Sequence, residues 1–308
     1  MVFRPWWFYD NMLFMHKLSG KNCLVSGCTA SCLTILLVFL VIWFAFSKLD
    51  VVSKIEKGIE GLGFFKSTQL SHLYSKDKPI KLRVGLISDS ESDWDYLEIA
   101  LTEIKSRDIN KIFHLGDITH LGVSSDLQLA KDYFIKSGIE VYPIPGDRDL
   151  WKSRGLESFQ NVFGDSYRVV ELSGVRFMLI DNADEYEGIG QDQLTFISEN
   201  LNDANFVLFH NPVYFGIKSL WGKGMGEYSV SVDLQRKDLL GQIRSSPSVL
   251  ATFAGDQHLF SENVDDIKSS LFHYIIGSTS SERNIERPNF AILTVYDDGD
   301  YYVEKVSF

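Results

Sequence analysis

Short apolar runs in this chain repeatedly end in an acidic or histidine side chain. Residues 84–91 form one such run, which ends with Asp89 and Glu91 separated by a single residue. Carboxylates at that spacing on the tip of a strand can both turn toward one cation. The runs at 111–117, 141–147, 206–210 and 249–256 end in the same way. Because the carboxyl ends of neighbouring strands meet at one edge of a sheet, these five ends predict one shared site.

The elements that must position these side chains lie downstream of Pro79. Strand-like and helix-like segments alternate there, which predicts parallel strands joined by helices, and the final part changes to antiparallel strands. We therefore expect an α/β domain in which two mixed sheets are flanked by helices. The expected strands are 81–89, 111–117, 140–145, 167–172, 175–181, 206–210, 249–254, 272–276, 290–296 and 301–306. The expected helices are 94–105, 126–136, 153–163, 191–201 and 232–244.

The order and spacing of the strand-end residues resemble those of the calcineurin-like metallophosphoesterases, over residues 81–308. That family's pattern is Asp-x-His, Gly-Asp, Gly-Asn-His-Asp/Glu, a lone His and Gly-His-x-His, each block after a strand. The matching blocks here are Asp89-Ser90-Glu91, Gly116-Asp117, Gly146-Asp147-Arg148-Asp149, Phe209-His210-Asn211 and Gly255-Asp256-Gln257-His258. The resemblance implies a four-layer α/β/β/α sandwich and a catalytic domain at residues 79–308.

The resemblance also implies a site for two divalent metal ions. One metal would be held by Asp89, Glu91 and His258, the other by Asp147, His210 and Asp256, with Asp117 bridging the two. Two such ions can hold a hydroxide for attack on phosphorus and neutralise the charge that develops there. This set is richer in carboxylates than the family pattern, which favours Mn²⁺ or Mg²⁺, with Fe as a further candidate, over Zn²⁺.

The chain departs from the family pattern at four positions. Glu91 and Asp256 stand where the family has histidines, and Asp147 stands for an asparagine. Arg148 replaces the histidine that assists catalysis in the family; an arginine cannot donate a proton at neutral pH, but it can clamp a phosphate through paired N–H groups. His120 is the candidate replacement acid, and the alternative is a solvated loop histidine.

Asp149 is the remaining candidate catalytic residue. It is expected either to orient Arg148 through an ion pair or to cap a helix. The resemblance implies hydrolysis of a phosphomonoester, phosphodiester or phosphoanhydride. The expected substrate is a phosphorylated small molecule or, as the membrane anchor suggests, a lipid-linked one. The departures leave two alternatives, a catalytically inactive binding domain with the same fold and a site for a single metal ion or a structural Ca²⁺. The net charge of −11 argues against a nucleic-acid partner, which would require a basic face.

The N-terminal part of the chain carries the signal of a membrane anchor. Residues 23–46 contain no charged side chain and are long enough to cross a bilayer as one helix. An aromatic and basic tail at 1–22 precedes them, and a juxtamembrane helix and linker are expected at 47–78. A buried core helix is the alternative for 23–46, although these residues show no polar face. The short tail favours a single-pass protein whose catalytic domain lies outside the cytoplasm.

Overall fold

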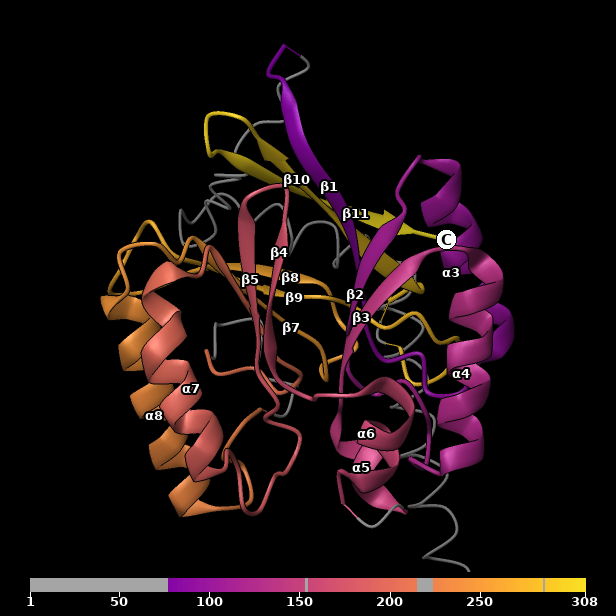
Figure 1. Cartoon of the computed structure of the whole chain (residues 1–308), viewed down its shortest axis with the longest axis horizontal. Coiled ribbons are helices and arrows are strands. Elements are labelled where there is room, and N and C mark those ends of the chain that lie inside the picture. Colours follow the sequence, from indigo (N-terminus) through magenta and orange to yellow (C-terminus); the bar gives the residue numbers. More distant parts are fainter. Residues whose placement is uncertain (1–76, 153–154, 215–223, 285) are drawn as a thin grey trace, which may run out of the picture. The chain divides into compact units, whose positions relative to one another are not determined.

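Two mixed β-sheets face each other at the centre of the domain (Figure 1). The computed structural model describes residues 77–152, 155–214, 224–284 and 286–308. The first sheet has the strand order β11-β10-β1-β2-β3, in which β1, β2 and β3 are parallel and β10 and β11 are antiparallel. Its strands are β1 (Ile80–Ile87), β2 (Lys111–Leu115), β3 (Glu140–Ile144), β10 (Asn289–Tyr296) and β11 (Tyr301–Ser307).

The second sheet has the strand order β4-β5-β6-β7-β9-β8. Strands β5, β6, β7 and β9 are parallel, and the antiparallel β4 and β8 form its two edges. Its strands are β4 (Arg168–Leu172), β5 (Val175–Leu179), β6 (Phe206–Leu208), β7 (Ala251–Ala254), β8 (Ser261–Val264) and β9 (Phe272–Ile275). Both sheets are therefore mixed, as the sequence predicts.

Helices cover the outer face of each sheet, which completes four layers (Figure 1). An apolar core between the sheets includes Phe113 and Phe177, whose rings lie 4.6 Å apart. Helices α3 (Trp94–Ser106), α4 (Ser124–Ser137) and α6 (Glu157–Phe163) pack on the first sheet, whereas α7 (Gln191–Asn200) and α8 (Val230–Ser245) pack on the second. The remaining helical elements are α5 (Asp147–Trp151) and the 3-10 turn η1 (Leu201–Asp203).

Two elements differ from the sequence-based expectation. The helix expected at 153–163 begins at Glu157, and a separate short helix, α5, precedes it. Strand β8 was not expected, because its residues Ser261–Val264 are mostly polar; it is an edge strand that pairs only with β9. The predicted transmembrane segment 23–46 and the linker up to residue 76 lie outside the described residues. Among the residues that the structure does describe, no helix is long and apolar enough to span a bilayer.

Candidate metal centre

The loops that follow β1 and β2 are joined side by side through their backbones. The amide of Asp89 donates to the Gly116 carbonyl, and that of Glu91 donates to the Asp117 carbonyl, both at 3.0 Å. Asp89, Glu91 and Asp117 have φ angles of 53°, 44° and 51°, in the left-handed region that side chains other than glycine rarely adopt. Asp256 and His258, after β7, share this conformation, with φ angles of 68° and 51°. Strained backbone at so many strand tips is typical of a functional site.

Two glycines allow these tips to approach each other. A Cβ atom at Gly116 would lie 2.5 Å from His210 Nδ1, and one at Gly146 would lie 2.2 Å from Asp117 Oδ1. Gly116 also has a φ angle of +93°, which favours glycine. Both glycines are thus steric requirements, because the His210 ring packs against Gly116 and the Asp117 carboxylate packs against Gly146.

One half of the centre gathers Asp147, His210 and Asp256, whose ligand atoms lie within 4.8 Å of one another. His210 is fully buried and donates its Nδ1–H to the Leu115 carbonyl at 2.8 Å, so that Nε2 is the ring nitrogen that faces the acids of the centre. That Nε2 lies 3.3 Å from Asp147 Oδ1 and 3.4 Å from Asp117 Oδ1. A second group, Asp89, Asp117 and His210, satisfies the same distance limit. Both groups meet at His210 Nε2.

This half fits a divalent cation. The buried Oδ2 atom of Asp256 has no hydrogen-bond partner in the described part of the chain, and a bound ion would satisfy it. Burial raises the pKa of the Asp256 carboxyl to about 7 and also raises the pKa of Asp117. Although burial opposes it, the Asp117 carboxylate and the hydrogen bond to Asp147 raise the pKa of His210 well above its usual value. Nε2 of His210 therefore faces a cluster of buried acids, and a bound cation would favour the ionised form of each of them.

The other half of the centre surrounds Glu91 with basic side chains. Its Oε1 atom lies 2.9 Å from Arg148 Nε, 3.4 Å from His258 Nε2 and 3.6 Å from Arg283 Nη1. These contacts are ion pairs and not aligned hydrogen bonds. Burial alone would raise the pKa of the Glu91 carboxyl, but His258 and Arg148 lower it below its usual value.

The structure thus divides the seven predicted metal ligands into two sets. It brings Asp89, Asp117, Asp147, His210 and Asp256 into groups that can hold a cation. Glu91 and His258 join no such group among the described residues. His258 instead contacts Glu91, and its Nε2 lies 3.6 Å from Asp89 Oδ1. The Arg148 guanidinium lies between Glu91 and Asp117, with Nε 3.5 Å from Asp117 Oδ2.

Asp149 is placed as a helix cap, one of the two alternatives for this residue. Its buried carboxylate accepts hydrogen bonds from the amides of Gly146, Ile118 and Thr119, and from the Thr119 hydroxyl, at 2.8–3.1 Å. These bonds fix the start of α5 and therefore the position of Arg148. His120 lies at the rim, with its side chain 40% exposed and Nδ1 3.7 Å from Glu91 Oε2.

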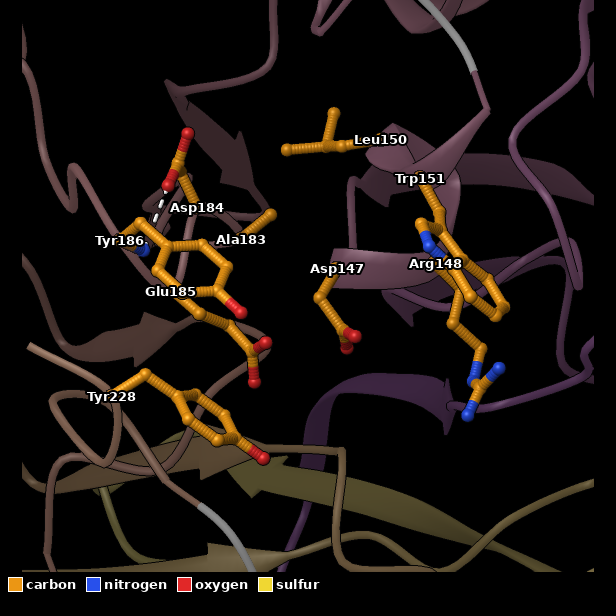
Figure 2. Close-up of a pocket in the computed structure, with 9 residues that line it drawn as sticks. All are labelled: Asp147, Arg148, Leu150, Trp151, Ala183, Asp184, Glu185, Tyr186 and Tyr228. Atoms are coloured by element: carbon orange, nitrogen blue, oxygen red, sulfur yellow. Dashed lines mark hydrogen bonds between the residues drawn. The ribbon is translucent and has the colours of Figure 1, made fainter. Parts of the chain in front are cut away.

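A cavity of about 470 Å³ opens beside the centre. Figure 2 shows the Asp147 carboxylate between two walls of this cavity. One wall carries Arg148 and Trp151 from α5; the other carries Tyr186 and Tyr228, whose rings stack at 5.9 Å. The cavity thus combines the charged groups of Asp147 and Arg148 with aromatic surface.

Sequence reasoning missed two residues of the centre. Arg283 lies in the loop between β9 and β10, outside every family block, and no local pattern distinguishes it from a surface arginine. Asn182 is buried, and its Oδ1 accepts from the amides of His210 and Asn211 at 3.1 and 3.0 Å, which fixes the position of His210. Asn182 follows the apolar run of β5, so the signal that identified the other strand ends could have found it.

Comparisons with known proteins agree with this fold. A dimetal phosphatase from Danio rerio is 15% identical, with a TM-score of 0.56, and the match covers 74% of this chain and 99% of that one. A purple acid phosphatase from yellow lupin (Lupinus luteus) seeds is 14% identical, with a TM-score of 0.55, over 73% of this chain and 51% of that one. At these identities the likeness shows the fold. A search of curated proteins by sequence finds no match.

The sequence itself matches the family model described as calcineurin-like phosphoesterase, over residues 82–260. This range contains all seven predicted metal ligands. Since the match extends over more than half of the sequence, the chain belongs to the calcineurin-like phosphoesterase family.

Proposed function

We propose that this protein is a membrane-anchored, metal-dependent phosphoesterase. The observation that carries the proposal is the group formed by Asp147, His210 and Asp256, whose ligand atoms lie within 4.8 Å of one another and which includes an Asp256 oxygen without a hydrogen-bond partner among the described residues. A cation bound there would supply positive charge to the phosphate oxygens and would lower the pKa of a bound water. The cavity beside Asp147 gives a substrate access to that place.

The arginines of the centre supply the phosphate contacts. Arg148 lines the cavity, and Arg283 has a side chain that is 43% exposed. Both guanidinium groups can donate N–H groups to phosphate oxygens, and Glu91 holds the two of them at the same carboxylate. Their fixed positive charge stabilises the charge that builds up on the transferring phosphoryl group.

His120 is the candidate proton donor to the leaving oxygen. Its ring is exposed at the rim of the centre, lies close to Glu91 and makes an edge contact with Trp151 at a centroid distance of 6.4 Å. Arginine cannot take this role, since it keeps its proton at neutral pH. A good leaving group, such as that of a phosphoanhydride, needs this donor less than an alkyl phosphate does.

The substrate is proposed to be a phosphorylated small molecule or a lipid-linked phosphate. The volume beside Asp147 accommodates a leaving group larger than the phosphate itself, and the aromatic wall gives it apolar surface. The chain's net charge of −11 disfavours a nucleic-acid substrate. The uncharged segment 23–46 supports attachment to a membrane.

The activity is tested on the purified full chain. After chelation and re-addition of Mn²⁺, the protein should hydrolyse p-nitrophenyl phosphate or its bis-ester, and Asp256→Asn should not. Asp132→Asn, an exposed carboxylate on α4, is the matched control and should retain the wild-type rate. Wild-type protein that is folded and metal-loaded but inactive on monoesters, diesters and anhydrides would establish the inactive binding domain instead.

The anchor is tested separately. The full chain expressed in cells should stay in the membrane pellet after washes with high salt and with alkaline carbonate. Recovery in the soluble fraction after either wash would contradict a transmembrane segment at residues 23–46.

A further inference from the structure

The place where a second metal ion would bind is occupied by an arginine side chain. In the family pattern, the residues at positions 89, 91 and 258, together with the bridging Asp117, would hold that ion. Here the Arg148 guanidinium lies between Glu91 and Asp117, with Nε 2.9 Å from Glu91 Oε1 and 3.5 Å from Asp117 Oδ2. A metal ion bound to the same two oxygens would lie about 2.1 Å from each of them. Its position would overlap that of the guanidinium.

Several contacts hold Arg148 in this position. Its backbone amide donates to Asp117 Oδ1 at 2.9 Å, and its guanidinium carbon lies 5.7 Å from the centroid of the Trp151 ring, in a cation–π contact. The residue lies in α5, whose first turn is fixed by the Asp149 carboxylate. Only 22% of the Arg148 side chain is exposed. A guanidinium keeps its charge at all ordinary pH values, so it cannot give way to a metal ion by losing a proton.

The remaining ligands also point to a single ion. The two groups that can hold a cation, Asp89–Asp117–His210 and Asp147–His210–Asp256, share His210. Since its Nδ1–H donates to Leu115, His210 can offer only Nε2 as a ligand atom, and one nitrogen can bind only one ion. The two groups are thus two parts of one coordination shell and not two sites.

We infer that the centre binds one divalent cation, at His210, and that the Arg148 guanidinium provides the second positive charge of a two-cation site. Arg283, in the loop between β9 and β10, adds a further positive charge 3.6 Å from Glu91. The number of bound ions is inferred from the geometry alone. The catalytic role of Arg148 rests in addition on the proposed function. The expected ion is Mn²⁺ or Mg²⁺, which prefers oxygen ligands.

Counting bound Mn²⁺ tests the inference. The full chain is freed of metal, equilibrated with excess Mn²⁺, desalted and measured by mass spectrometry, and its paramagnetic resonance spectrum is recorded. Wild-type protein should hold one Mn²⁺ per chain and give the six-line signal of an isolated ion. Arg148→His, which restores the family residue, and Arg148→Ala should hold two ions with an exchange-coupled spectrum. Arg148→Lys, which keeps the charge, should hold one.

The outcomes separate this inference from the proposed function. Two ions per wild-type chain, or none, would overturn the inference. A count of one in both folded Arg148→His and folded Arg148→Ala would also overturn it, since removal of the guanidinium should open the second position. Wild-type protein that holds two ions and hydrolyses phosphate esters would refute only the inference. Protein that holds one ion and hydrolyses none would refute only the proposed function.

Discussion

The two halves of the centre are built alike and hold their positive charge differently. Each consists of carboxylates and a histidine at strand tips, with Asp117 between them; its Oδ1 faces His210 and its Oδ2 faces Arg148. Around His210, a carboxylate oxygen of Asp256 has no hydrogen-bond partner in the described part of the chain, and a bound cation would satisfy it. Around Glu91, Arg148 and Arg283 already supply the positive charge.

This difference teaches that a ligand-competent side chain does not by itself make a metal ligand. Glu91 has the chemistry to bind a cation, and it lies at the tip of the correct strand. What decides its role is the nearest positive charge, which is a side chain of the same protein. A buried carboxylate with a fixed guanidinium partner gains little from a metal ion that must first displace that partner.

Removing the carboxylate that joins the halves should have the largest effect. Asp117→Asn replaces the carboxylate that the two halves share with a neutral amide, which weakens cation binding at His210 and removes the ion-pair partner of Arg148, so phosphate-ester hydrolysis should fall on the order of 10³-fold. The measurement is kcat/KM on p-nitrophenyl phosphate, with Asp132→Asn as the exposed control. A loss no larger than that of the control would mean that Asp117 does not join two working halves.

Matched isosteric substitutions should then show which half of the centre binds the metal ion. Asp256→Asn should lower Mn²⁺ affinity by more than about 100-fold, because it replaces a charged oxygen ligand with a neutral amide. Glu91→Gln should change that affinity by less than about 10-fold, since Glu91 faces arginines and not the ion. Isothermal titration with Mn²⁺ gives both affinities. Equal losses in the two variants would show that both halves bind metal.

His120 should matter in proportion to the difficulty of the leaving group. We expect His120→Gln to lower kcat on the order of 10²-fold for phenyl phosphate, whose leaving oxygen needs a proton. The fall on p-nitrophenyl phosphate should be much smaller, because nitrophenolate leaves unprotonated. Comparing kcat for the two substrates makes the measurement independent of metal content. An equal fall on both would assign His120 a positioning role beside Glu91.

The smallest expected effect concerns the stability of the fold and comes from a buried charged cluster outside the centre. His273 lies between Thr252 Oγ1, at 2.8 Å, and Asp265 Oδ2, at 2.9 Å, while Arg244 contacts Asp265 and the Tyr214 ring stacks on the imidazole. Burial lowers the pKa of His273 from 6.5 to about 4. The unfolded chain therefore takes up this proton near pH 6.5 and the folded chain only near pH 4. The stability that the neutral imidazole contributes is present above that window and is lost as the pH falls through it.

A substitution in this cluster distinguishes the effect of acid on the stability of the fold from the effect of metal loss. In the presence of a chelator, the difference in unfolding free energy between wild type and His273→Gln should shrink by about 2 kcal/mol from pH 7 to pH 5. Urea unfolding at the two pH values measures it. If the difference stays constant, His273 is not held neutral by burial, and acid acts on the protein through the centre alone.

The sequence predicts most of the fold because the central strands are continuous apolar runs with turn residues between them. It misses β8, whose polar residues Ser261–Val264 carry no strand pattern and pair only because β9 lies beside them. Helix α5 is missed for a similar reason, since its start depends on the Asp149 carboxylate and on loops that come together only in the fold.

The site is predictable as a set of residue types and not as a set of pairings. Strand-end position correctly brings Asp147, His210 and Asp256 together. The partner of Glu91 could not be predicted, because Arg148 and Arg283 approach it from loops distant in sequence. From the sequence, Arg148 is recognised only as the replacement of a proton-donating histidine. Its position between two carboxylates is known only from the structure.

The central claim is that one bound cation, together with Arg148, hydrolyses phosphate esters. The most direct test adds Mn²⁺ stepwise to the metal-free full chain, at a protein concentration far above the dissociation constant, and follows phosphate release at each step. The rate should rise linearly and reach a plateau at one equivalent of Mn²⁺ per chain. A plateau at two equivalents, or no phosphate release at any loading, would contradict the account.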